Sequence, residues 1–481
     1  MDMDMKRREQ AQPKKGGMRE MMIIAIPMII SQACYTLMTF TDRMFLSRLG
    51  PEYMNAAMGG GLTVFMMMTF FWGLTGYATV LVAQYLGSGN KKHCAIAITQ
   101  SVIIVFLAYP IILACRPLAH SLFAFMGITP NQLAPQKLYF DILLYAVILS
   151  LLRNSFSSFF SGIGKTKIIM IASFTAMSVN VCVNYLLIFG KFGFPALGIR
   201  GAAYGTIIGA GCGLSVLLAS YFSKANRKEY GVLRSFRFDK KVTGILLHFG
   251  YPAGLEMFLN LLAFDIIIMI FHSMGPVVAT ASTIVFNWDM VSFVPLLGME
   301  IGVISLVGRY MGAGDPATAH KSTMSGLKLG LIYSAFVLFF FIIFPSNLVE
   351  VFRPTSMGVI FIQAKPIAVF MIRMAALYVL VEAMLITFIG ALRGAGDTFW
   401  AMLISVALHW IIVPILFIML KVMGMPLQIC WSVMVAIFFL FSFVLYLRYR
   451  SGHWKKIKVI RPISQAEPAV VQSDFHEPSD L

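Results

Sequence analysis

The chain has 481 residues, of which 59% are hydrophobic and only 12% are charged. A soluble domain is about half apolar and about a quarter charged, so this composition excludes a soluble globular enzyme. The apolar residues form blocks of the length that a helix needs to cross a bilayer, about 20 residues. Short alternating segments, which are typical of a membrane β-barrel, are not seen. The composition therefore predicts an all-α polytopic membrane protein.

The net charge of +17 does not predict nucleic-acid binding. The basic residues cluster in the N-terminal tail, in a central loop and after the last apolar block. No platform of interleaved aromatic and basic residues, on which bases could stack, accompanies these clusters. Such clusters are typical of the cytoplasmic flanks of membrane spans, where they attract anionic lipid headgroups. The six cysteines are scattered, without metal-site spacing, and we expect no cofactor.

Twelve spanning helices are predicted in chain order. They cover residues 20–46, 55–87, 93–116, 136–161, 168–190, 199–222, 240–273, 277–310, 319–343, 361–393, 398–419 and 428–450. Several are long for one crossing, which predicts tilt. With the N-terminus in the cytoplasm, most Lys and Arg residues fall on the cytoplasmic side, which predicts that both termini lie there. We expect the protein in the inner membrane of a bacterium.

The sequence matches itself at a shift of 225 residues. Pro27 then aligns with Pro252, and the pattern Leu-Val-x-x-Tyr-x-Gly-x-Gly at 81–89 aligns with the same pattern at 306–314. Hydrophobicity alone does not explain shared Gly and Pro positions. Two parallel six-helix repeats are therefore predicted, as a V-shaped pair of lobes with a site between them. The two aligned prolines are candidate hinges.

The repeat and the basic loop predict five segments. These are a basic N-terminal tail (1–19), an N-lobe (20–222), a basic linker (223–239), a C-lobe (240–450) and a tail whose end is disordered (451–481).

Seven acidic residues fall within predicted spans, where a charge is costly and usually functional. They are Asp42, Asp141, Glu256, Asp265, Asp289, Glu300 and Glu382. A carboxylate in such surroundings can hold a proton or ligate Na⁺. Asp42 shares one helix face with Tyr35 and Met38. The alternative role for Asp42 is a local ion pair with Arg43.

Glu256 is followed one turn later by Asn260, whereas Asp265 lies on the opposite side of the same helix. We therefore expect Glu256 to face the central cavity. The alternative is an ion pair between Glu256 and Arg309 or Arg373.

Asp289 and Glu300 are eleven residues apart and so lie on nearly one helix face. Glu382 and Arg393 have the same spacing on a later helix. Asp265, Asp289 and Glu300 are secondary candidates for ion binding.

Asp141 is interpreted as the partner of Arg153 or Arg373 in an ion pair. Asn180 and Asn184 form an i,i+4 amide pair, which could bridge helices by hydrogen bonds or coordinate an ion.

No nucleotide site is predicted. Gly164-Lys165-Thr166 has Phe159 where the phosphate-binding loop needs its first glycine. The energy source is therefore expected to be an ion gradient.

Five segments resemble motifs of the multidrug and toxic compound extrusion (MATE) family, and the resemblance covers residues 20–450. The segments are 41–43 (Thr-Asp-Arg), 83–90 (AQYLGSGN), 195–203 (PALGIRGAA), 308–315 (GRYMGAGD) and 392–398 (LRGAGDT). The resemblance implies a monomeric antiporter that exports small organic cations in exchange for H⁺ or Na⁺. It also implies that Asp42 and Asn180 form an N-lobe coupling site, with Asn184 where some members carry an aspartate.

The resemblance further implies a C-lobe sodium site in one subgroup of the family. Glu382 matches one of its carboxylates. Asn260 occupies the position of the other, and Glu256 lies one turn away as a substitute. Na⁺ is thus predicted either at Asp42 and Asn180 or at Glu256 and Glu382.

The alternative function is a flippase for a lipid-linked saccharide or another amphiphile, from the same superfamily. Such a protein is expected to have a cationic cavity. A membrane-embedded enzyme would need a cluster of His and Asp residues, and the eight His residues are dispersed. The sequence leaves the substrate and the coupling ion open.

Overall fold

The computed structural model describes residues 14–125, 130–353 and 359–460. These residues form helices joined by short loops, with no strand among them. Eleven helices in the described part are long and apolar enough to cross a membrane, or twelve if one bent pair counts as a single span. The predicted class, an all-α polytopic membrane protein, is confirmed. The predicted disorder at the end of the C-terminal tail falls on residues 461–481, which lie outside the described residues.

The helices before the basic linker pack into an N-terminal bundle. It consists of α2 (Met18–Ser47), α3 (Pro51–Gly76), α4 (Ala78–Gly87), α5 (Lys91–Ala114), α6 (Arg116–Phe125), α7 (Pro130–Tyr145), α8 (Val147–Gly162), α9 (Thr166–Phe189) and α10 (Ile199–Tyr221). The linker holds α11 (Lys224–Tyr230) and the short turn η1 (Val232–Arg234).

The remaining helices pack into a C-terminal bundle. It consists of α12 (Lys240–His272), α13 (Pro276–Gly312), α14 (Pro316–Ile343), α15 (Pro345–Glu350), α16 (Val359–Ala395), α17 (Thr398–Phe417), the π-helical turn η2 (Ile418–Val422), α18 (Leu427–Arg450) and η3 (His453–Lys456).

Two predicted spans are broken. The span predicted at 55–87 consists of α3 and α4, which meet at Tyr77. The span predicted at 136–161 consists of α7 and α8, which are bent by 44°. The short helices α6, α11 and α15 were not predicted, because none of them is long enough to show as a spanning block.

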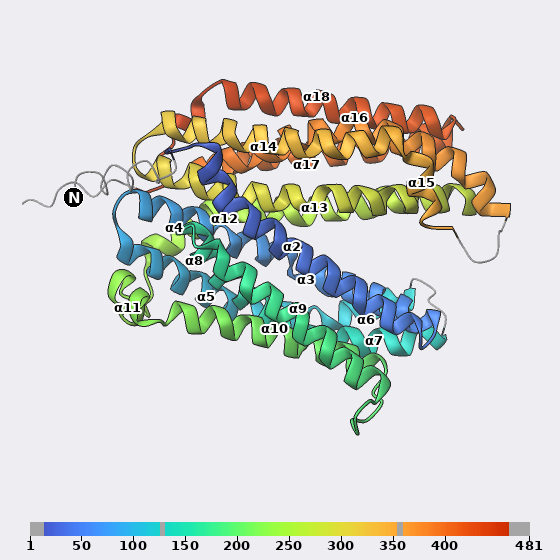
Figure 1. Cartoon of the computed structure of the whole chain (residues 1–481), viewed down its shortest axis with the longest axis horizontal. Helices are drawn as coiled ribbons and strands as arrows, with labels where there is room; N and C mark the ends of the chain where they lie inside the picture. Colours follow the sequence, from blue (N-terminus) through green and yellow to red (C-terminus); the bar gives the residue numbers. More distant parts are fainter. Residues whose placement is uncertain (1–13, 126–129, 354–358, 461–481) are drawn as a thin grey trace, which may run out of the picture.

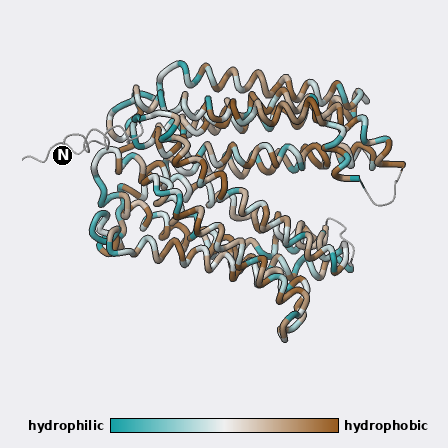
Figure 2. The backbone as a smooth tube through the Cα atoms, in the orientation of Figure 1, coloured by the Kyte–Doolittle hydropathy of each residue, from teal (hydrophilic) through white to brown (hydrophobic). Residues whose placement is uncertain are grey.

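The two bundles meet at the end of the molecule where α4 and α11 lie and diverge toward the end where α6 and α15 lie (Figure 1). Hydrophilic residues gather at the helix ends and loops, and hydrophobic residues cover the middle of the helices (Figure 2). This distribution fits helices whose central parts face lipid tails.

Polar contacts join the bundles at the end where they meet. Gln84 Nε2 of α4 donates a hydrogen bond to the Gly394 carbonyl of α16 over 3.0 Å. Ser305 Oγ of α13 donates to the Ser161 carbonyl of α8 over 2.7 Å. In addition, α13 packs on α2 and α4, and α12 packs on α3. These helices form the interface between the bundles.

Candidate functional site

Asp42 forms a buried polar site in the N-terminal bundle. It lies near the end of α2 and only 7% of its surface is exposed. Asn184 Nδ2 of α9 donates a hydrogen bond to Asp42 Oδ1. Thr206 Oγ1 of α10 donates to Asp42 Oδ2 over 3.3 Å. Arg43 is exposed and, within the described residues, no ion pair joins it to Asp42, so the alternative local pair is not formed.

The two asparagines of α9 complete this site. Both are fully buried, and Asn180 Nδ2 donates to Thr206 Oγ1 over 3.4 Å. The Oδ1 atoms of Asn180 and Asn184 accept no hydrogen bond within the described residues. Buried acceptors without a donor are costly, and amide oxygens are ligands that hard cations prefer. The sequence pattern identified the amide pair but not Thr206.

Glycines of α10 bring these groups together. A Cβ atom at Gly205 would collide with Asn184 Oδ1, and a Cβ atom at Gly209 would lie 2.9 Å from Asn180 Cβ. Only glycine therefore lets α10 approach α9 so closely, as in other small-residue helix contacts. This approach carries Thr206, the neighbour of Gly205, to the Asp42 carboxylate.

Tyr35 and Met38 precede Asp42 on α2 but differ in exposure. Met38 is buried, whereas Tyr35 has 46% of its surface exposed. Tyr35 is therefore the accessible member of this predicted face.

The C-terminal bundle holds two neighbouring carboxylates, half-buried Asp289 and buried Glu382. Tyr378 OH of α16 donates a hydrogen bond to Asp289 Oδ1 of α13. Glu382 lies one turn after Tyr378 and close enough to Asp289 for the negative charge of Asp289 to act on it. Glu382 is 8% exposed, and its Oε2 atom accepts no hydrogen bond from the described part of the chain. Two charged carboxylates close together in largely apolar surroundings are costly unless a proton or a cation accompanies them.

Glu256 belongs to a different cluster. Arg393 Nη2 lies 2.8 Å from Glu256 Oε2, and Arg393 Nη1 lies 2.7 Å from Glu300 Oε1. The alternative prediction, that Glu256 pairs with Arg309 or Arg373, is thus wrong. The reason is that Arg393 lies near the end of α16, which packs along α13, and its guanidinium reaches both Glu300 of α13 and Glu256 of α12.

The two carboxylates of the predicted sodium site, Glu256 and Glu382, belong to different clusters. Arg393, which holds Glu256, is eleven residues from Glu382, about 16 Å along α16. The equal spacings predicted on two helices do have a structural meaning. On α13, Asp289 contacts Tyr378 of α16, one turn before Glu382. Glu300, eleven residues after Asp289, contacts Arg393, which is eleven residues after Glu382.

The other two candidates on α12 lie apart from these clusters, and the Oδ1 atom of Asn260 accepts no hydrogen bond within the described residues. Asn260 Nδ2 donates to Ser405 Oγ of α17 over 2.8 Å. Asp265 is half-buried and forms no hydrogen bond or ion pair with the described residues. Neither is part of the clusters around Arg393 or Tyr378.

Asp141 forms an ion pair that was assigned to the wrong partners. Its carboxylate accepts two hydrogen bonds of 2.7 Å from Arg116, and His120 Nε2 lies 2.8 Å away. Arg153 instead donates to Ser173 Oγ over 2.8 Å. The unpredicted helix α6 is the cause, because it places Arg116 and His120 one turn apart beside α7.

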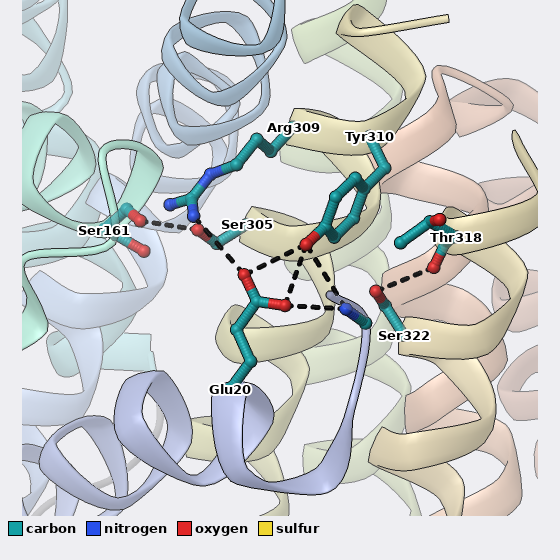
Figure 3. Close-up of polar contacts among 8 residues, drawn as sticks. Glu20, Ser161, Ser305, Arg309, Tyr310, Thr318 and Ser322 are labelled. Atoms are coloured by element: carbon teal, nitrogen blue, oxygen red, sulfur yellow. Dashed lines mark hydrogen bonds and ion pairs between the residues drawn. The ribbon is translucent and has the colours of Figure 1, made fainter. Parts of the chain in front are cut away.

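A further cluster ties the bundles together near the N-terminus (Figure 3). Tyr310 OH of α13 donates to the two carboxylate oxygens of Glu20 over 2.8 and 3.1 Å. The Gly16 N–H donates to Glu20 Oε2 over 2.7 Å, and Arg309 Nη1 lies 3.7 Å from Glu20 Oε1. Glu20 was not singled out in the sequence because it lies at the edge of a predicted span.

Glu20→Gln is expected to weaken this contact. The amide keeps a hydrogen-bond acceptor but loses the charge that attracts Arg309, at a cost of about 1 kcal/mol. The fraction of molecules in which the two bundles have separated at this end should then rise about fivefold. Distances between spin labels at the exposed Lys224 and Lys456 would measure the change. Glu52→Gln, in the first turn of α3, is the control. An unchanged distance distribution would contradict a role of Glu20 in closure.

The fold and these sites define an α-helical membrane transporter with two homologous halves. The chain belongs to the MatE family, whose model matches residues 27–186 and 252–418. The two matches begin at Pro27 and Pro252, the prolines that the internal repeat aligns. The protein is therefore a transporter and not an enzyme.

Relatives and solved structures agree with this assignment. The chain is 27% identical over 451 residues to the "Probable multidrug resistance protein NorM" of Thermotoga maritima, covering 92% of this chain and 94% of the relative. It is 24% identical to the "Multidrug resistance protein PmpM" of Pseudomonas aeruginosa, covering 82% of both chains. A MOP superfamily transporter from Pyrococcus furiosus superposes with a TM-score of 0.83 at 19% identity, covering 92% of this chain and 97% of that one. A structure of MATE in complex with MaL6 has a TM-score of 0.83 at 20% identity, covering 93% and 100%.

Proposed function

We propose that the protein is a monomeric antiporter that exports organic cations from the cell in exchange for H⁺ or Na⁺. The names of the relatives support multidrug export. The relatives are bacterial proteins, which supports a place in the bacterial inner membrane. The basic clusters support cytoplasmic termini.

One observation carries this proposal: the buried carboxylate of Asp42 has only uncharged partners. Asn184 and Thr206 donate hydrogen bonds to it, but no Lys or Arg in the described chain pairs with it. A charge in such surroundings is neutralised by a cation. A proton, a sodium ion and an organic cation can all do this, but only one can do so at a time.

Mutually exclusive binding gives exchange. The coupling ion and the substrate each bind Asp42 in a different state of the transporter. Their different affinities for the two states shift the populations that are open to either side. If the ion is Na⁺, the amide oxygens of Asn180 and Asn184 and the Thr206 hydroxyl supply further hard ligands. If it is H⁺, the same groups hold the carboxyl in place by hydrogen bonds.

Asp289 and Glu382 are proposed as a second ion site. Asp289 is half-buried and Glu382 is buried, they lie on the neighbouring helices α13 and α16, and Tyr378 is a neutral donor to Asp289. Glu256 is not assigned to this site, because Arg393 already balances its charge.

Pro27 and Pro252 are proposed as hinges. They lie inside α2 and α12, which both contact the opposite bundle. A proline removes one backbone hydrogen bond from a helix and so eases bending there.

Transport in proteoliposomes tests the proposal. Vesicles are loaded with a fluorescent organic cation such as ethidium, and a pH gradient or a Na⁺ gradient is imposed separately. One of the gradients is expected to accelerate release at least about tenfold over vesicles without a gradient, and it identifies the coupling ion. If folded protein responds to neither gradient, cation antiport is refuted. Movement of a lipid-linked saccharide in the same vesicles would then favour a flippase.

A further inference from the structure

A long apolar groove lies between the bundles, on the side of the basic linker. It has a volume of about 530 Å³ and is walled by α3, α5 and α12. Its lining includes Phe70, Leu107, Ile111, Phe238, Leu247 and Tyr251. The volume is typical of sites for small organic ligands, about 300–1,000 Å³. Because α3 and α5 belong to one bundle and α12 to the other, the groove exists only while the bundles hold this arrangement.

Three cations flank Phe238, a residue that lines this groove. Phe238 stands between Arg237 and the two lysines that begin α12, Lys240 and Lys241. Arg237, Lys240 and Lys241 are all exposed. Lys240 shares a helix face with the lining residue Leu247, seven residues later.

One carboxylate, Asp239, stands among these three cations and offsets only one of their charges. Asp239 Oδ1 accepts hydrogen bonds from the backbone N–H groups of Lys241 and Val242 over 3.0 and 3.1 Å. It therefore serves as the N-cap of α12. The end of the groove thus keeps an excess of positive charge.

A buried side chain fixes this arrangement. Gln100 of α5 is fully buried and binds three groups around the end of the groove. Its Nε2 donates to the Arg237 carbonyl over 2.8 Å, and its Oε1 accepts from the Asp239 N–H and the Thr243 hydroxyl over 3.1 and 3.0 Å. The linker is thereby held against α5, and the cations keep their place beside the apolar walls.

We infer that the groove is a binding site for an anionic phospholipid. An acyl chain lies along the apolar walls, and the phosphate lies between Arg237 and Lys240. A zwitterionic lipid fits less well, because its ammonium group meets the same cations. Basic pockets between membrane helices commonly bind anionic headgroups in this way. The lipid contacts both bundles and so stabilises the arrangement in which the groove is open.

Native mass spectrometry of the delipidated full-length protein tests this inference. Phosphatidylglycerol and phosphatidylcholine with the same acyl chains are titrated separately. Wild type is expected to bind phosphatidylglycerol at least about tenfold more tightly. The double variant Arg237→Gln/Lys240→Gln should lose about tenfold or more of this affinity, since each basic residue near the headgroups contributes about fivefold. The control Arg227→Gln/Lys228→Gln removes the same charge from the exposed face of α11 and should bind like wild type.

The apolar walls are tested separately. Leu247→Trp fills the groove and should weaken phosphatidylglycerol binding about tenfold. Leu447→Trp on α18, at a similarly exposed leucine (46% against 44%), should not. A photoactivatable phosphatidylglycerol should label α5 and α12. Melting temperatures in the same detergent show that each variant is folded.

Three results would overturn the inference. If wild type bound the two lipids with equal affinity, the groove would not select an anionic headgroup and would be an ordinary lipid-facing surface. Equal losses in the Arg237 variant and its control would show a general surface charge effect. Complete displacement of the lipid by inorganic phosphate would show an anion site that does not need the groove.

Discussion

Asp42→Asn is expected to reduce gradient-driven release of an organic cation to the rate of protein-free vesicles. The amide has nearly the same shape and can still form hydrogen bonds with Asn184 and Thr206. It cannot release a proton at neutral pH, and it brings no charge to balance a cation. Both ion and substrate should therefore lose their binding site. The measurement is the rate of release under the gradient that drives wild type.

Two further measurements make this prediction specific. Asp265→Asn changes a half-buried aspartate of α12 that has no polar partner in the described chain, and it should keep at least about half of the wild-type rate. The melting temperature of Asp42→Asn should not fall, since the variant removes a buried charge and keeps the packing. Gradient-driven release by Asp42→Asn at the wild-type rate would move the coupling site to Asp289 and Glu382.

Arg393→Met is expected to destabilise the protein strongly. Glu256 and Glu300 are buried, and both depend on this one guanidinium. Removing one member of a buried ion cluster leaves uncompensated charge and typically costs about 3–5 kcal/mol. The melting temperature in detergent should fall by several degrees, with a lower yield of folded protein.

Rescue separates the charge effect from a packing effect. In the triple variant Arg393→Met/Glu256→Gln/Glu300→Gln no buried charge is left unpaired, and most of the lost stability should return. Arg353→Met, which breaks an exposed pair with Glu350, should leave the melting temperature unchanged. A triple variant as unstable as Arg393→Met would show that the packing of the arginine, rather than its charge, matters.

The sequence by itself determined the class, the repeats and part of the site. Spans are visible because an unbroken block of about 20 apolar residues has the length of a bilayer crossing. The repeat is visible because Gly and Pro recur at a fixed shift, and the family match begins at the same two prolines. Asp42, Asn180 and Asn184 stood out because polar groups inside spans are rare. The helix face on which each of these residues lies follows from local periodicity alone.

Only the tertiary structure decided which of these groups meet. Glu256 pairs with Arg393 and Asp141 with Arg116, and neither partner was expected. Thr206 entered the site because α10 approaches α9 at its glycines, whereas nothing in its own sequence neighbourhood marks a threonine as functional. The physical reason is that helix periodicity defines which residues share a face. The neighbour that this face contacts depends on how each helix is rotated and shifted against the others, and packing between segments far apart in the chain sets that rotation and shift.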